Sequence, residues 1–193
     1  MSQTKAQLIN AVDGSIVDAD IVGLTSSKLS GALPAISGAS LTNLDAGKIL
    51  QVKQTFKSDV TSLTSNSSSS YSDISGMSVS ITPSNSSNKI LIAWVCSVGC
   101  SLSGRYNILR LLRGSTVIGN STVGTFVNGQ AEDRSATDVC RPYNMIFLDS
   151  PSTTSETTYK MQWSCESGTY FLNSDHHGSQ GATSHITAME VSV

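Results

Sequence analysis

The most metal-like feature of the sequence is a group of histidines near its C-terminal end. The segment NSDHHGSQGATSH holds Asp175, His176, His177 and His185. Imidazole and carboxylate groups bind zinc, but adjacent histidines on a strand face opposite ways, so at most one of them would meet His185 within one chain. His177 and His185 are therefore weak candidates for a cation site on the axis of a trimer. The favoured interpretation is a polar loop between the last two strands, with no metal and no cofactor.

Catalytic chemistry has little support in the residue patterns. Glu132 with Asp133 or Asp138 are the only clustered acids in an expected loop, QAEDRSATD, and two convergent carboxylates are what glycoside hydrolysis requires. The favoured interpretation of this segment is a solvated loop. The sequence has no nucleophile elbow, phosphate-binding glycine loop, HExxH pair or nucleotide fingerprint. We therefore expect no catalytic residues and no enzymatic activity.

Recognition of a sugar or protein surface is the remaining chemistry that the loops could provide. Serine, asparagine, tyrosine and histidine offer hydrogen bonds and flat stacking faces with little net charge. The two tryptophans, Trp94 and Trp163, lie on apolar strand faces and are expected in the core instead. The candidate receptor contacts are Tyr71, Tyr106, Asn107, Tyr170, Asn173, His176 and His177.

Composition limits the class of partner. Of the 193 residues only 13% are charged, and the net charge is −2, which excludes a nucleic-acid clamp. The longest apolar stretch, Ile90 to Val98, is far below the roughly 20 residues of a membrane span, so we expect no membrane insertion.

The chain has 36 serines and 18 threonines, a bias towards strands and turns. Cys96, Cys100, Cys140 and Cys165 match no zinc spacing, and buried thiols are preferred over a disulfide in a protein made in the cytoplasm.

The composition changes near residue 46, which predicts an N-terminal part unlike the rest. Residues 14–46 carry single aliphatic residues among Gly, Ser, Ala and Asp, and one such chain buries too little area to offset its backbone ordering. Three parallel copies would bury these aliphatics together, so we prefer a short interwoven trimeric stalk to a flexible linker. The expected packing residues are Ile16, Ile21, Leu24, Leu29, Leu33, Ile36, Leu41 and Leu44.

Residues 1–13 precede the stalk and could form a two-turn helix capped by Thr4. Such a helix is too short to be stable alone, so it either docks on another protein or frays. Its docking face would be Leu8, Ile9 and Val12.

From residue 47 onward the apolar residues alternate, which is typical of half-buried strands. The run from Ile90 to Cys100 is apolar on both faces and is predicted to be a central strand or to lie at a subunit interface. About nine strands and no helix pattern predict an all-β sandwich over residues 47–193, most plausibly a jelly roll. The expected strands are 49–56, 77–81, 90–100, 106–113, 116–127, 143–148, 159–165, 169–172 and 185–193, and a Ser-rich loop is expected at 65–72.

The stretch GSIVDADIVGLTSSKLSGALPAISGASLTNL resembles the repeat-bearing stalks of fibre proteins of tailed bacteriophages. The order GKILQV, SDISGMSVSITPSNSSNKILI, LLRGST, FLDSPSTTSETTYKMQ and HITAMEV resembles the C-terminal head of short fibres and virion surface proteins of aquatic and cyanobacterial phages. The resemblance covers about residues 14 to 193. It implies a homotrimer whose heads are similar to the jelly rolls of complement-type and tumour-necrosis-factor-type trimers.

Three functions are consistent with this sequence. The first is a non-enzymatic short tail fibre on the virion surface, docked by its N-terminus on a baseplate, tail or capsid protein, with a head that contacts a host glycan or protein. The second is a capsid decoration or head-fibre protein, because the stalk is short. The third is a polysaccharide-degrading enzyme.

Overall fold

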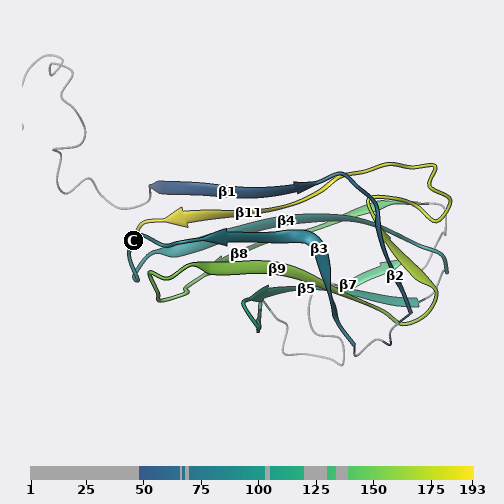
Figure 1. Cartoon of the computed structure of the whole chain (residues 1–193), viewed down its shortest axis with the longest axis horizontal. Coiled ribbons are helices and arrows are strands. Elements are labelled where there is room, and N and C mark those ends of the chain that lie inside the picture. The colour runs from purple at the N-terminus through teal and green to yellow at the C-terminus, as the bar shows by residue number, and fades with distance from the viewer. Residues whose placement is uncertain (1–47, 66, 68–69, 103–104, 120–129, 134–138) are drawn as a thin grey trace, which may run out of the picture. The chain divides into compact units, whose positions relative to one another are not determined.

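The computed structural model describes residues 48–65, 67, 70–102, 105–119, 130–133 and 139–193. The expected docking arm (1–13, with Leu8, Ile9 and Val12) and the stalk (14–46, with its eight aliphatic residues) lie outside the described residues. The described part is all-β and contains eleven named strands in two antiparallel sheets (Figure 1). No helix of the described residues is long and apolar enough to cross a membrane.

The first sheet, sheet A, has the order β1-β11-β4-β10-β2, and β8 also pairs with β4. β4 is therefore central, as its two apolar faces predicted. The strands of sheet A are β1 (Ile49–Lys57), β2 (Thr61–Thr64), β4 (Lys89–Cys100), β8 (Arg141–Asp149), β10 (Thr169–Leu172) and β11 (Ser184–Val191).

The second sheet, sheet B, has the order β3-β9-β5-β6, and β7 also pairs with β5. A bulge in β3 at Gly76, whose φ is +79°, shifts its register against β9. The strands of sheet B are β3 (Ser72–Ile81), β5 (Arg105–Arg113), β6 (Thr116–Ile118), β7 (Gln130–Asp133) and β9 (Thr157–Cys165).

The core lies between the two sheets and is formed by the inward residues of the alternating strands. Ile92, Trp94 and Cys96 of β4 face Tyr159, Met161 and Trp163 of β9 within a single buried cluster. Both tryptophans are buried, which confirms their prediction as core residues. Burial of this alternating set is what makes the two sheets a sandwich.

Three details of the expected strand pattern were wrong. β2 was not predicted, because TSLT is short and lies beside a Ser-rich run. β7 lies where a solvated loop was expected, since its backbone pairs with β5 although QAED has no apolar alternation. The strand expected over 116–127 ends at Ile118, at Gly119 with φ +70°, and residues 120–127 lie outside the described part.

Candidate functional site

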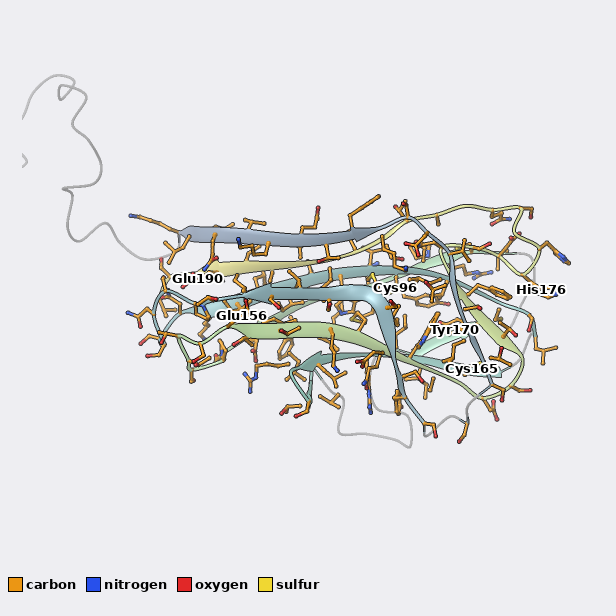
Figure 2. The ribbon with its side chains drawn as sticks, viewed as in Figure 1. Cys96, Glu156, Cys165, Tyr170, His176 and Glu190 are labelled. Carbon is orange, nitrogen blue, oxygen red and sulfur yellow. The ribbon has the colours of Figure 1, made fainter. Side chains whose placement is uncertain are left out.

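The sandwich has two ends, which we call proximal and distal. The chain enters at the proximal end, where Ser192 N donates to Lys48 O, so that the start of β1 and the end of β11 lie together. Glu190 and Glu156 lie at this end and His176 lies at the opposite, distal end (Figure 2).

The distal end carries a loop, residues 173–183, whose shape is fixed by the buried carboxylate of Asp175. This carboxylate accepts hydrogen bonds from Ser179 N (2.8 Å), Ser179 Oγ (2.5 Å) and Gln180 N (3.2 Å). These bonds, the Ser179 hydroxyl foremost, lower the pKa of Asp175. A bridge between Ser174 and Gly181 closes the base of the loop. Asp175 thus organises the backbone instead of being available to a metal.

Two exposed histidine rings stand on this loop. The ring centroids of His176 and His177 are 4.8 Å apart, and His176 lies 6.0 Å from the half-buried ring of Phe171. Flat rings held on a hydrogen-bonded loop give a stacking and hydrogen-bonding surface at little entropic cost. The structure therefore places these two receptor candidates together at an exposed position.

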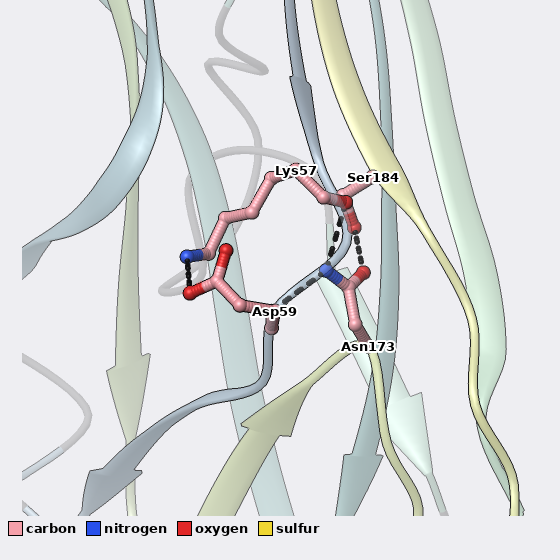
Figure 3. Close-up of polar contacts among 4 residues, drawn as sticks. All are labelled: Lys57, Asp59, Asn173 and Ser184. Carbon is pink, nitrogen blue, oxygen red and sulfur yellow. Dashed lines mark hydrogen bonds and ion pairs between the residues drawn. The ribbon is translucent and has the colours of Figure 1, made fainter.

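Asn173 was expected to contact a receptor, but it is only 1% exposed, so that prediction is wrong. Its amide Nδ2 donates to the carbonyls of Lys57 and Asp59 (3.0 Å each), and its Oδ1 accepts from Ser184 Oγ (2.6 Å; Figure 3). The residue has φ +64°, a conformation that asparagine tolerates better than most residues. Asn173 therefore ties the base of the distal loop to β1 and β11.

Tyr170 was also expected at the surface and is also buried, at 1% exposure. It packs 5.6 Å from Trp163, measured between ring centroids. Burial raises the pKa of its hydroxyl well above the ordinary value, and among the described residues that hydroxyl has no hydrogen-bond partner. Tyr170 supports the distal end from within the core, because β10 is flanked by both β2 and β4.

Tyr71 is half-buried and belongs to a polar group on the outer face of sheet B. The Arg110 guanidinium lies 3.5 Å from its ring centroid and donates to Gln162 Oε1. Gln162 and Lys160 in turn donate to Asp73 at 2.6 and 2.8 Å, and the Lys160 bond foremost lowers the pKa of Asp73. Sequence patterns do not predict this array, since Asp73, Arg110 and Gln162 come from three different strands and Tyr71 precedes β3.

The remaining candidates are placed only by their backbones. Tyr106 and Asn107 lie on β5, paired with Glu132 and Ala131 of β7. Asp133 pairs with Arg105, and Asp138 lies outside the described residues. The acids expected in a loop are thus partly in a strand.

The expected metal candidates do not form a ligand set. His185 lies half-buried at the start of β11, beside Phe56 and Val95, whereas His177 stands on the distal loop. In the part of the chain that the structure describes, no three His, Cys, Asp or Glu residues lie close enough to hold a metal. Cys96, Cys100 and Cys165 are buried and Cys140 is half-buried. Burial raises the pKa of Cys96, which disfavours the reactive thiolate.

Glu190 at the proximal end is a buried polar residue that the sequence did not single out. Its Oε1 accepts from Ser84 N, Ser84 Oγ and Asn88 Nδ2, and its Oε2 accepts from Gln51 Nε2, at 2.6 to 2.7 Å. The one sign in the sequence is an acid at an inward position of an alternating strand. This carboxylate joins β1, β11 and the β3–β4 turn.

No protein-family model matches the sequence, and no curated protein matches it. Among solved structures, the tripod (BppUct-A-L) from the baseplate of bacteriophage Tuc2009 aligns over 97% of this chain and 92% of its own, with 14% identity and a TM-score of 0.35. The VP2 subviral particle of infectious bursal disease virus aligns over 83% of this chain, with 13% identity and a TM-score of 0.38. This chain spans 43% of the VP2 chain. Likenesses this weak assign no function.

Proposed function

We propose that this chain is a non-enzymatic virion surface protein of a tailed phage, a short tail fibre whose head contacts the host surface through its distal end. The observation that carries the proposal is the pair of exposed histidine rings on a loop fixed by Asp175, at the end of the sandwich opposite to Lys48. The sequence resemblance to fibre stalks and heads supports the same function. Docking on the particle would use the N-terminal arm.

The head is further proposed to be a jelly roll. β1, β11, β4 and β8 are neighbours in sheet A, and β3, β9, β5 and β6 are neighbours in sheet B. Strands that follow one another along the chain mostly lie in different sheets, so most connections cross from one sheet to the other. Such crossing between two antiparallel sheets is the arrangement of a double Greek key. Its rigid strands would hold the distal loop in place for recognition.

Host contact is tested with the full-length protein on cells of candidate bacterial hosts. His176→Ala combined with His177→Ala should reduce cell binding by about tenfold or more, because flat contact surface and hydrogen bonds are lost. Glu156→Ala, an exposed change at the proximal end, is the control and should bind normally (Figure 2). Equal binding by all three proteins would contradict a distal receptor site.

Location and chemistry separate the alternatives. Gold-labelled antibody on virions should mark the tail, with copies in the tens or fewer; hundreds of copies on the shell would instead favour a decoration protein. Release of reducing sugar ends from host polysaccharide would favour an enzyme.

Deletion of residues 1–12 should abolish incorporation into virions, and normal incorporation would refute the docking arm.

A further inference from the structure

The outer face of sheet A is apolar across four strands. Cross-strand pairing aligns three rows, each running from β1 through β11 and β4 to β8. Eight of the twelve positions are apolar, three carry an uncharged amide or hydroxyl group, one is His185, and none is Asp, Glu, Lys or Arg. The rows are Val52, Met189, Leu91 and Leu148; then Gln54, Thr187, Ala93 and Ile146; then Phe56, His185, Val95 and Asn144.

Four apolar side chains of this face, on β1 and β8, are open to solvent in the single chain. Val52, Phe56, Ile146 and Leu148 are between 48% and 70% exposed. Four strands about 4.8 Å apart and rows about 6.8 Å apart make a flat patch of roughly 400 Å². Contiguous apolar patches of this size on a monomer usually mark an interaction site.

The outer face of sheet B is different. It presents Asp73, Gln162 and Arg110 in one cross-strand row, and Ser78, Lys160 and the buried Leu112 in the next. Strands of both sheets alternate inward and outward side chains. The two outer faces therefore differ only in the types of residue at the outward positions. The described part of this face therefore carries charged side chains that the three rows of sheet A lack, although it also holds the buried Ile108 and Leu112.

We propose that the outer face of sheet A is covered by a second copy of this chain. The three rows carry no Asp, Glu, Lys or Arg side chain, and Lys89 lies in the row beyond them, paired with Val191. Two copies can therefore meet over these rows without like-charge repulsion and without burying an unpaired charge. Gln54, Asn144 and His185 can hydrogen-bond across such an interface. A strongly charged partner would find no complementary group in these three rows.

The position of β1 supports self-association over another partner. β1 begins at Ile49, directly after Lys48, and supplies Val52 and Phe56 to the face. A patch of about 400 Å² per chain is below the roughly 800 Å² of a standard stable interface. Copies joined through residues 14–46 would hold the heads at a high effective concentration, at which a small apolar contact suffices. In this respect the inference rests on the proposed function, whose stalk is trimeric.

The occupant is identified by photo-crosslinking in the full-length protein. Benzoylphenylalanine in place of Ile146 should give covalent dimers or larger oligomers on irradiation, mapped by mass spectrometry to sheet A of another copy. The same probe in place of Ser75, exposed on β3 of sheet B, is the control and should give none. Crosslinks within one chain to residues 14–46, or no crosslink at all, would overturn the proposal.

Charge substitution provides an independent measurement. Val52→Lys with Ile146→Lys should weaken self-association, measured by sedimentation, by about 100-fold. Where the stalk keeps the chains together, the probe is placed at Leu148 instead. The two lysine substitutions should then abolish the crosslink that this Leu148 probe gives in the otherwise unsubstituted protein. Ser75→Lys with Ser80→Lys adds the same charge to sheet B and should change neither readout. An unchanged association and crosslink in the sheet A variant would refute the interface.

Failure of this inference is distinguishable from failure of the proposed function. Loss of the crosslink with retained binding to host cells would remove the interface and leave the distal receptor site. A normal crosslink in a protein that binds no host cell would leave the interface and remove the receptor role.

Discussion

Glu190 shows how a single buried carboxylate can hold the proximal end of the head. It is fully buried, and burial alone would raise its pKa. The hydrogen bonds from Asn88, Gln51 and Ser84 outweigh burial and lower the pKa to about 2. The charged form is therefore the form that the fold stabilises.

Replacing Glu190 by Gln should destabilise the head by about 1–3 kcal/mol at pH 7, because an amide NH₂ would face the donor of Gln51 or the donors of Ser84 and Asn88. Chemical denaturation of both proteins measures the difference. An equal free energy of unfolding would show that the carboxylate charge is unimportant.

The same pair of proteins should differ in their dependence on pH. The folded pKa of Glu190 is about 2 and the ordinary value is 4.5, so its stabilising contribution is complete above about 4.5 and is lost as the pH falls towards 2. The stability gap between the native protein and Glu190→Gln should therefore narrow across this range. A gap independent of pH would contradict the lowered pKa.

Asn173 is the corresponding residue at the distal end. Asn173→Ala removes three hydrogen bonds. It also puts alanine at φ +64°, a conformation that alanine tolerates less well than asparagine. We therefore expect the free energy of unfolding to fall by about 2–4 kcal/mol. Asn173→Gly loses the same bonds but tolerates the backbone conformation, and should be less destabilised. Thermal unfolding of both variants tests this order, and a reversed order would show that the positive φ is not a source of strain.

At the scale of elements, the close approach of β4 to the distal loop depends on Gly99. A Cβ at this position would lie 2.5 Å from Ser174 O and 2.9 Å from both Asp175 Cα and Val139 O. These are backbone atoms, so the loop base cannot yield by a side-chain rotation. The loop that carries His176 and His177 is therefore seated directly on a strand of sheet A.

Gly99→Ala should consequently lower the free energy of unfolding by about 1–3 kcal/mol and displace the distal loop. The proposed binding to host cells should fall as well. Gly181→Ala in the same region is the matched control, because a Cβ there meets no atom within 4 Å, and its effect should stay within about 0.5 kcal/mol. Denaturation midpoints of the two variants give the comparison. Equal effects would mean that the loop base adapts freely.

Alternation predicted most strands because burial of one sheet face leaves a period-two trace in the sequence. It located the cores of β4 and β9 and the burial of Trp94 and Trp163. It missed β7, whose residues QAED have no alternation and whose pairing with β5 is carried by backbone atoms. The β-propensity of its residues cannot predict such a strand, since the strand that stabilises it, β5, comes from elsewhere in the chain.

For the whole molecule, the proposed stalk and the outer face of sheet A are expected to act together in assembly. Replacing Ile21, Leu29 and Leu33 jointly by Ser should weaken self-association or virion attachment while leaving a folded head, because the aliphatic contacts between chains are lost. Sedimentation and the far-ultraviolet β signal measure the two effects separately. Unchanged association and attachment would show that residues 14–46 act only as a linker.

The sequence by itself predicted the β-sandwich that the described residues form, with Trp94 and Trp163 in its core, since alternation and turn chemistry are local properties. It also placed His176 and His177 in an exposed polar loop. Only the tertiary structure decided that Asn173 and Tyr170 are buried, that Glu190 joins the proximal turn, and that Val52 and Ile146 share an exposed apolar face. The physical reason is that burial and pairing depend on which distant strands become neighbours, and strand order is a property of the whole fold.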